Sequence, residues 1–328
     1  MKRGIPALIL TLASGVVFAE NPVVTVALGG PPSTYMIPLY VAQDAGLFAK
    51  DGVDVKTMTV SGDQNSMRAV LTGDADVAVI GPPIMYETLG NGGKVKTIAG
   101  WQETTDYYLI LGKGKGSTIK DAAGKTLAVS TPGSMPQIVP EMIFKKNNID
   151  STGTKYAPIG GNTARIQAVI SGKIDGTIAD TLNSLRGERS GKVTLITTTA
   201  QQFPEGLGYI LLAVKESELT DPVKRKALLA FVKGSIEGAR MTVDQPVKAA
   251  DIFYKKNGGD VDLQLIKDSI QQLNRFKVWG VNGGISKSVH DFTMKTYVDF
   301  GLSKNSLSYD QVYDPSLVNQ LLKEIGTR

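Results

Sequence analysis

The chain carries one sequence pattern twice, with the two copies 99 residues apart in a sequence of 328 residues. The first copy runs from Val60 to Gly81 and the second from Ile159 to Asp180. Each copy is typical of a strand end, a polar loop with glycine, a short helix, a glycine turn and a buried strand. The repeat predicts two similar lobes, each directing a loop and a helix N-terminus at the space between them. The identical pairs are Gly62 with Gly161, Ala69 with Ala168, Val70 with Val169, Gly73 with Gly172 and Asp76 with Asp175.

Short apolar segments alternate with helical segments around both copies, and they lack the clean alternation of half-exposed strands. Such segments are typical of a mainly parallel sheet covered by helices on both faces. From Pro222 onward the pattern is almost entirely helical, which suggests a discontinuous first lobe closed by C-terminal helices. We predict an α/β fold with a first lobe of residues 20–110 and 210–328, a second lobe of residues 111–209, and a hinge of two strands.

The first residues predict a secretory signal peptide. Lys2 and Arg3 precede an apolar run from Ile5 to Phe18, and Ala19 supplies a small residue at the expected cleavage site. A charged start, a short apolar core and a small-residue site are typical of such a leader. We therefore expect residues 1–19 to be removed and the mature protein to lie free in the periplasm. Because the chain has no cysteine, we expect no lipid anchor.

Composition excludes several classes of site. Without cysteine, the chain cannot form disulfides, thiol nucleophiles or iron–sulfur sites. His290 is the single histidine, which argues against a catalytic triad or a histidine-based metal site. The formal net charge is +5, but the lysines are scattered and do not form the basic face that nucleic acids need. We expect no enzyme activity, no cofactor and no nucleic-acid partner.

Candidate ligand-binding residues lie mainly in loops that connect strands to helices, where open α/β sheets bind ligands. Helix N-termini in these loops attract negative charge. The loop at 130–134 combines hydroxyl groups with a glycine and is the best predicted anion site. Asp180 ends an apolar strand and could pair with a ligand amine or with a protein cation. The candidates are Ser33, Thr34, Tyr35, Gly62, Asp63, Gln64, Gly81, Pro82, Gln102, Thr131, Gly133, Ser134, Gly161, Asn162 and Asp180.

Structural roles are the alternative for several of these residues. Asp63 and Asn162 open predicted helices, and aspartate and asparagine are good N-caps without any ligand. Trp101 and Trp279 could stack on a ligand, but large aromatic side chains more often pack in the core.

The segment from residue 37 to residue 55 resembles a known family. It reads Ile-Pro-Leu-Tyr-Val-Ala-Gln at 37–43, Gly-Leu-Phe at 46–48 and Gly-Val-Asp-Val at 52–55. These motifs resemble the opening of nitrate/sulfonate/taurine-type solute-binding proteins of ABC importers, a family with a branch that binds thiamine pyrimidine precursors. The resemblance continues to Val-Tyr-Asp-Pro-Ser-Leu at 312–317 and covers essentially the whole mature chain.

The resemblance implies a two-lobed periplasmic-binding-protein fold of type II. Such a protein closes on one small molecule and delivers it to a membrane permease with a cytoplasmic ATPase. Sulfonate- and taurine-binding relatives hold the anionic head with loop hydroxyls and amides, which matches Ser33, Gly62, Gly133 and Ser134 in kind, and taurine binders hold the amine with acidic residues such as Asp180. The implied ligand is a small organic anion or zwitterion, similar to a sulfonate or taurine, bound by a monomer.

Two alternatives to this ligand and role stay open. The chain could bind a thiamine pyrimidine precursor or another small heterocyclic or aromatic compound. It could also be a sensory ligand-binding protein coupled to a signalling partner. The acidic loop that follows Gly100 makes nitrate a less attractive ligand and favours a polar or cationic group.

We predict that Asp180→Ala and Ser134→Ala each weaken ligand binding without unfolding the protein. The reason is that both side chains belong to the predicted walls of the ligand site. Titration calorimetry on both variants, with circular dichroism as the control for folding, checks this. Unchanged affinity in both variants would contradict the site assignment.

Overall fold

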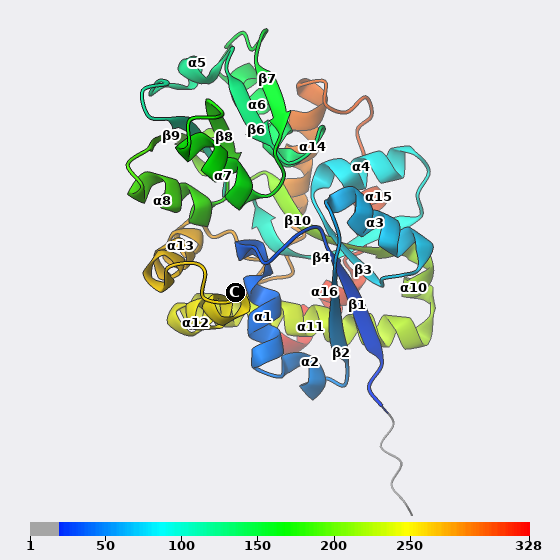
Figure 1. Cartoon of the computed structure of the whole chain (residues 1–328). Coiled ribbons are helices and arrows are strands. Elements are labelled where there is room, and N and C mark those ends of the chain that lie inside the picture. Colours follow the sequence, from blue (N-terminus) through cyan, green and yellow to red (C-terminus); the bar gives the residue numbers. More distant parts are fainter. Residues whose placement is uncertain (1–19) are drawn as a thin grey trace, which may run out of the picture.

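Two lobes, each built around one β-sheet, form the protein in a computed structural model that describes residues 20–328 (Figure 1). The predicted signal peptide, residues 1–19, lies outside the described residues. Among residues 20–328, no helix combines the length and the apolar character needed to cross a membrane.

The first sheet has five strands in the order β2-β1-β3-β10-β4. Strand β10 reaches this sheet from the far side of the second lobe, as the apolar run near residue 210 predicts. The strands are β1 (Val23–Leu28), β2 (Asp54–Thr59), β3 (Val77–Ile80), β4 (Val95–Thr104) and β10 (Gly208–Lys215). The helices between β1 and β4 are η1 (Thr34–Met36), α1 (Ile37–Asp44), α2 (Leu47–Lys50), α3 (Asp63–Thr72) and α4 (Pro82–Gly90).

The second sheet repeats this order, as β7-β6-β8-β5-β9. Here the strand that arrives from the other lobe is β5, in the position that β10 holds in the first sheet. The strands are β5 (Tyr108–Gly112), β6 (Thr126–Val129), β7 (Lys155–Pro158), β8 (Gly176–Ala179) and β9 (Val193–Thr198). The helices are α5 (Ile119–Ala122), α6 (Met135–Lys146), α7 (Asn162–Ile170), α8 (Thr181–Arg189) and α9 (Thr199–Gln202).

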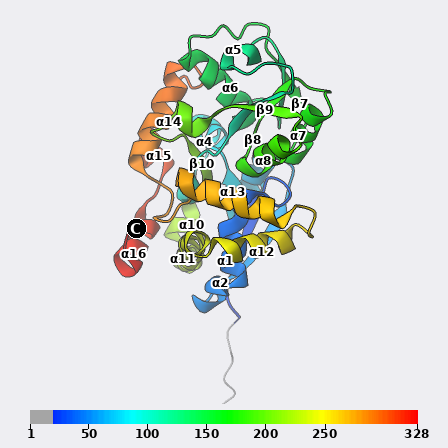
Figure 2. The same ribbon diagram turned by 90° about the vertical axis from the view of Figure 1, so that its left-hand side faces the viewer.

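The remaining helices pack on the first lobe and also reach the second. Helix α11 lies so close to α1 that a Cβ atom on Gly238 would meet the Pro38 carbonyl oxygen at 2.2 Å. Helix α13 packs against both α12 and α8, which places it between the lobes (Figure 2). These helices are α10 (Glu216–Thr220), α11 (Pro222–Asp244), α12 (Pro246–Lys256), α13 (Leu263–Phe276), α14 (Lys287–Asp299), α15 (Tyr309–Val312) and α16 (Ser316–Ile325).

The predicted α/β fold with two lobes, each built on a mainly parallel sheet, is confirmed, with one antiparallel strand in each sheet. In each sheet the first three strands run parallel, and the strand that arrives from the other lobe runs antiparallel to its neighbours. The strand from the other lobe, β10 or β5, enters the sheet at the edge where the parallel strands have their carboxyl ends. It therefore runs antiparallel to them. The predicted lobe boundaries stay a prediction; β5 begins at Tyr108, just before the predicted start of the second lobe.

Asp76 and Asp175, which are equivalent residues of the two repeat copies, form the same hydrogen bond in both lobes. Asp76 Oδ2 accepts the backbone N–H of Thr25 at 2.7 Å, and Asp175 Oδ2 accepts that of Thr126 at 3.1 Å. Each carboxylate thus ties the turn before the central strand of its sheet, β3 or β8, to the neighbouring strand, β1 or β6. Lys115 pairs with Asp175 at 2.8 Å, and its hydrogen bond, with that of Thr126, lowers the pKa of Asp175.

We predict that Asp76→Ala and Asp175→Ala each lower the free energy of unfolding by about 1–3 kcal/mol, because a strand N–H loses its partner. Since the folded pKa of Asp175 lies below its ordinary value, its contribution is present at neutral pH and is lost on acidification through that pKa. Urea denaturation at pH 7 and in acid measures both effects. The control is Asp74→Ala, at an exposed position, and an equal loss in that variant would contradict the assignment.

Candidate functional site

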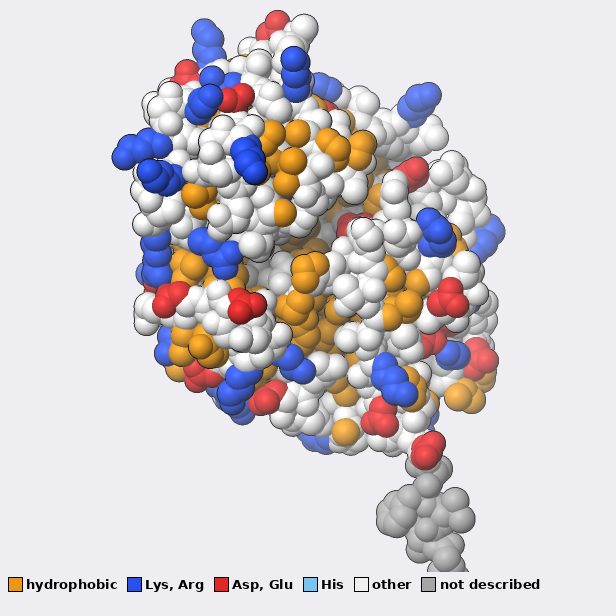
Figure 3. All heavy atoms as spheres, in the orientation of Figure 1, with side chains coloured by type: hydrophobic (Ala, Val, Ile, Leu, Met, Phe, Trp, Pro, Cys, Tyr) orange, Lys and Arg blue, Asp and Glu red, His pale blue; other side chains and the backbone are white. Residues whose placement is uncertain are grey.

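The predicted loops lie at the starts of helices that face the junction of the two lobes. In the first lobe, Ser33, Gly62 and Gly81 immediately precede η1, α3 and α4. In the second lobe, Ser134, Gly161 and Asp180 precede α6, α7 and α8. Gly62 has φ of 81°, a left-handed value that favours glycine. Figure 3 shows a furrow between the lobes where hydrophobic side chains gather, while Lys and Arg lie mostly on the outer surface.

Two connections link the lobes and lie side by side. Thr105 N donates to Leu207 O at 2.9 Å, and Thr199 N donates to Tyr107 O at 2.8 Å. The hydroxyl groups of Tyr107 and Tyr209 are 2.7 Å apart, so one of them donates to the other.

A cluster of three tyrosines, Tyr35, Tyr107 and Tyr209, follows from this pairing. The rings of Tyr107 and Tyr209 meet edge to face with centroids 5.1 Å apart, and Tyr35 meets Tyr209 in the same manner at 6.4 Å. Burial raises the pKa of Tyr35 and Tyr209 well above the ordinary value, so their hydroxyls remain protonated donors at neutral pH. The cluster offers aromatic edges and hydroxyl groups from both lobes.

Two buried carboxylates, Asp106 and Asp180, meet at the N-terminus of α8. Asp180 Oδ1 accepts the backbone N–H of Asn183 at 2.9 Å and its side-chain amide at 2.8 Å. Asp106 Oδ2 accepts the backbone N–H of Thr181 at 2.9 Å. Both carboxylates are almost fully buried, with 2% and 3% of Asp106 and Asp180 exposed. A helix N-terminus favours negative charge, which lets two carboxylates share this position.

Burial makes these carboxylates weaker acids than usual. Burial, followed by the nearby charge of Asp180, raises the pKa of Asp106 to about 7. The pKa of Asp180 is also raised by burial, against the opposing effects of Asn183 and Arg165. Within residues 20–328, neither carboxylate forms an ion pair with a lysine or arginine; the ion pairs that do form lie elsewhere.

Arg165 is the buried cation of the second lobe, and four of its five N–H donors are already used. Its Nη1 donates to Gly160 O at 2.7 Å, and its Nε and Nη2 both donate to Ile178 O. Nη2 also donates to Asn162 Oδ1, which in turn accepts the backbone N–H of Asp180 at 3.3 Å. The guanidinium therefore holds the α7 loop against β8 and keeps a single Nη1 hydrogen, which is too few for a bidentate interaction with a ligand anion.

One hydrogen bond crosses between the loops of the two lobes. Ser33 Oγ donates to Asp180 Oδ2 at 3.5 Å. Loops of both lobes also line a small cavity of about 40 Å³, which brings together five of the fifteen predicted residues but neither Ser33 nor Asp180. Asp63 lies at its exposed rim and accepts the backbone N–H of Gly81 at 2.8 Å. The residues that line this interlobe cavity are Ser61, Gly62, Asp63, Gln64, Pro83, Ile84, Thr131, Pro132, Ser134 and Met135.

The loop predicted as the best anion site uses much of its hydrogen-bonding capacity internally. Ser134 Oγ donates to Thr131 O at 2.6 Å, and Gly133 N donates to Gln137 Oε1 at 3.0 Å. These bonds stabilise the turn before α6. They leave fewer donors for a ligand than the sequence pattern indicates.

Three other candidates, Thr34, Pro82 and Gln102, do not line the interlobe cavity. Gln102 is fully buried inside β4, and neither amide atom has a hydrogen-bond partner among the described residues. Thr34 is buried and Pro82 opens α4. Trp101 and Trp279 are core residues. His290 is buried on α14, with Nε2 3.0 Å from Leu307 O.

Sequence reasoning missed the residues contributed by the lobe connections and by helix interiors. Asp106, Tyr107 and Tyr209 border the crossings, and Arg165 and Asn183 lie one turn inside α7 and α8. The acidic stretch before β5 was a signal for Asp106. Arg165 gave no signal, because a single arginine in a helix is usually exposed. Among residues 20–328, no group of three or more His, Cys, Asp or Glu side chains could hold a metal ion.

We predict that the protein loses stability as the pH rises from about 4 to about 7, because in this range the Asp106 carboxyl keeps its proton in the folded state but is ionised in the unfolded chain. Its folded pKa of about 7 lies above the ordinary 3.8, so its contribution is complete at low pH and lost as the pH passes 7. Asp106→Asn should flatten this slope and stabilise the protein at pH 8 by on the order of 1–3 kcal/mol. Urea denaturation at several pH values measures it. Asp260→Asn, at an exposed position, is the control, and an undiminished slope in Asp106→Asn would contradict the prediction.

Comparisons with known proteins agree with this architecture. A family model described as "NMT1/THI5 like" matches residues 33–249, about two thirds of the chain. The Bacillus subtilis (strain 168) protein YtlA, named as a candidate binding protein, is 31% identical over 121 residues. That alignment covers 36% of this chain and 36% of YtlA, so the chain matches about a third of the length of this curated relative.

Solved structures match over nearly the whole chain. The periplasmic nitrate-binding protein NrtA from Synechocystis PCC 6803 has a TM-score of 0.75 at 15% identity, covering 94% of this chain and 90% of that one. The alkanesulfonate-binding protein SsuA from Xanthomonas axonopodis pv. citri, bound to MOPS, has a TM-score of 0.70 at 12% identity, covering 90% and 99%. At these identities the likeness shows the fold. The predicted resemblance, the type II two-lobed fold and the expectation of a binding protein rather than an enzyme are confirmed. The chain belongs to the NMT1/THI5-like family.

Proposed function

We propose that this protein is the solute-binding component of an ABC importer, which captures a small molecule between its lobes and delivers it to a permease with a cytoplasmic ATPase. The family match, the fold and the names of the relatives support this role. The observation that carries it is the convergence of polar loops from both lobes, joined by the Ser33–Asp180 hydrogen bond. A ligand that touches both walls stabilises the closed form by its differential affinity for closed over open.

The ligand that the charges favour is a zwitterion, similar to taurine, rather than a simple anion. Asp180 is buried at the junction and forms no ion pair with any residue in 20–328, and burying a carboxylate without a cation is costly. A ligand ammonium group next to Asp180 would remove this cost. The spent donors of Arg165 and of the 131–134 loop make a purely anionic ligand less favourable.

The anionic end of such a ligand would face donors of the first lobe. The first turn of α3 presents N–H groups that have no intrahelical partner, and Ser33 and Tyr35 add hydroxyl groups nearby. Ammonium and anion would then be held by opposite lobes, which would favour closure.

A flat heterocycle that carries an amine, such as a thiamine pyrimidine precursor, is the second candidate ligand. The observation in its favour is the tyrosine cluster, whose rings come from both lobes. Aromatic rings bind such compounds by stacking and edge contacts. An adjacent sensor kinase gene, in place of permease and ATPase genes, would favour the sensory alternative.

We also propose that the mature protein is a periplasmic monomer that starts at Glu20, with a first lobe of residues 20–110 and 210–328 and a second lobe of residues 111–209. Relatives named as periplasmic support the location. N-terminal sequencing of the exported protein and light scattering test the cleavage site and the monomer.

The first test of the function is mass spectrometry of small molecules released from the purified protein, followed by a thermal-shift panel of taurine, isethionate, nitrate and pyrimidines. Taurine and isethionate differ only in the amine, so stabilisation by taurine alone would support the zwitterion. Uptake assays in cells that lack the gene then test import. No released compound, no thermal shift and normal uptake would contradict the proposed function.

We predict that Asp180→Asn lowers the affinity for an amine-bearing ligand at least tenfold, because the charge that pairs with the ammonium is lost. Asparagine still caps α8, so the melting temperature without ligand should stay equal or rise. Titration calorimetry measures the affinity. The matched control is Asp221→Asn, which changes an exposed N-cap of α11; an equal loss of affinity there would contradict the assignment.

A further inference from the structure

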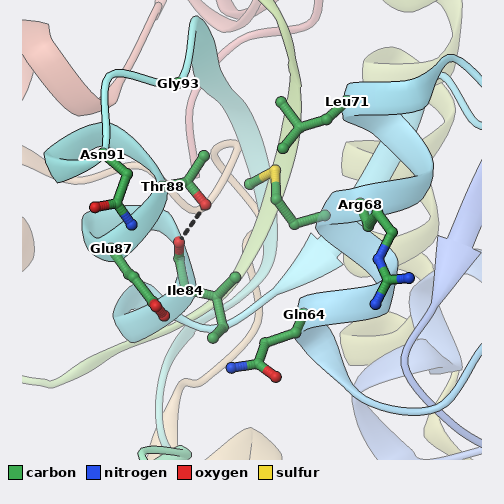
Figure 4. A pocket seen from close by; sticks show the side chains of 9 residues that line it. Gln64, Arg68, Leu71, Ile84, Glu87, Thr88, Asn91 and Gly93 are labelled. Carbon is green, nitrogen blue, oxygen red and sulfur yellow. Dashed lines mark hydrogen bonds between the residues drawn. The ribbon is translucent and has the colours of Figure 1, made fainter.

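A groove runs along the outer side of the first lobe between α3 and α4 (Figure 4). Its volume is about 330 Å³, within the range of small-molecule sites. Apolar side chains of both helices face into it, namely Met67 and Leu71 from α3 and Ile84 from α4. Leu71 is 47% exposed, so apolar surface here faces solvent.

The rim of the groove is polar, with Arg68 on one helix and Glu87 on the other. Both side chains are exposed, and within residues 20–328 neither takes part in an ion pair. The Thr88 hydroxyl donates a hydrogen bond to Ile84 O at 2.7 Å. The groove therefore combines an apolar floor with charged edges that remain hydrated.

The groove lies next to the interlobe cavity. Gln64 and Ile84 line both spaces, and both residues lie in the first turns of α3 and α4, at the mouth of the junction. The interlobe cavity of about 40 Å³ has room for little more than one water molecule, at about 30 Å³ each. The adjoining groove has room for roughly ten groups of that size.

We propose that the ligand is elongated, with a charged head between the lobes and a linear apolar tail that leaves the junction past Gln64 and Ile84 and lies in the α3–α4 groove. This inference rests on the proposed function and specifies its ligand class as a small amphiphile. The observation that carries it is that Gln64 and Ile84 line both spaces. A tail in this position contacts one lobe only, so it adds affinity without hindering closure.

The test uses two homologous series, alkylamines and alkanesulfonates from ethyl to decyl, titrated calorimetrically into the full-length mature protein. The affinity within the series that binds should rise about twofold to fourfold per added methylene until the groove is filled. Because the two series carry opposite heads, the comparison also reports the preferred charge, independently of the tail.

Leu71→Glu tests the position of the tail, since it places a charge on the apolar floor at an exposed site. It should remove most of the chain-length dependence and leave the affinity for the shortest member unchanged. The control is Val223→Glu, which makes the same kind of change at a residue 70% exposed on α11. An affinity that does not depend on chain length overturns the inference, and so does a dependence that survives in Leu71→Glu; in both cases binding of the short members leaves the proposed function standing. Absence of binding by every compound in both series overturns the inference alone, because the proposed function is tested separately with taurine and the pyrimidines.

Discussion

The pairing of the two lobe connections is the constraint on which the rest of the structure depends. The backbones of Thr105 and Leu207 form a hydrogen bond, and so do the hydroxyl groups of Tyr107 and Tyr209. Each connection delivers a strand into the other lobe's sheet, which explains why β5 and β10 run antiparallel to their neighbours. The same pairing places Asp106 and two tyrosines at the junction. The site is therefore a consequence of the crossing itself, and its geometry depends on both connections being in register.

The two copies of the repeat have the same backbone arrangement and differ in the residue that follows the central strand. Asp76 and Asp175 hold equivalent strand starts, which is why both copies keep them. At the other end of the central strands, Gly81 donates its backbone N–H to Asp63 of the same lobe, whereas Asp180 places a carboxylate at the start of α8. One lobe thus ends in neutral backbone and the other in a carboxylate. Under the proposed function, this difference would orient a ligand with unlike ends.

The sequence predicted the lobes because each copy of the repeat is local, with strand, loop and helix contiguous in the chain. It also predicted the helix starts, since capping residues and glycines mark them directly. The sequence did not predict the tyrosine cluster, because Tyr107 and Tyr209 are 102 residues apart and are brought together only by the paired lobe connections. The 131–134 loop shows the converse limit. Its hydroxyls suggested an anion site, but Ser134 Oγ satisfies its own turn, and spacing alone does not reveal which donors remain free.

The cost of burying Asp106 and Asp180 together would link the charge of the proposed ligand to lobe closure. Both carboxylates lie out of water at the start of α8, where protonation relieves part of their repulsion. An ammonium group on the proposed ligand would relieve the same repulsion and would compete with that proton. Binding of such a ligand should therefore release protons near neutral pH, and closure without ligand should become less favourable as the pH rises. A ligand without a positive charge would not reduce the free-energy cost of burying the two carboxylates, so this arrangement would not favour its binding.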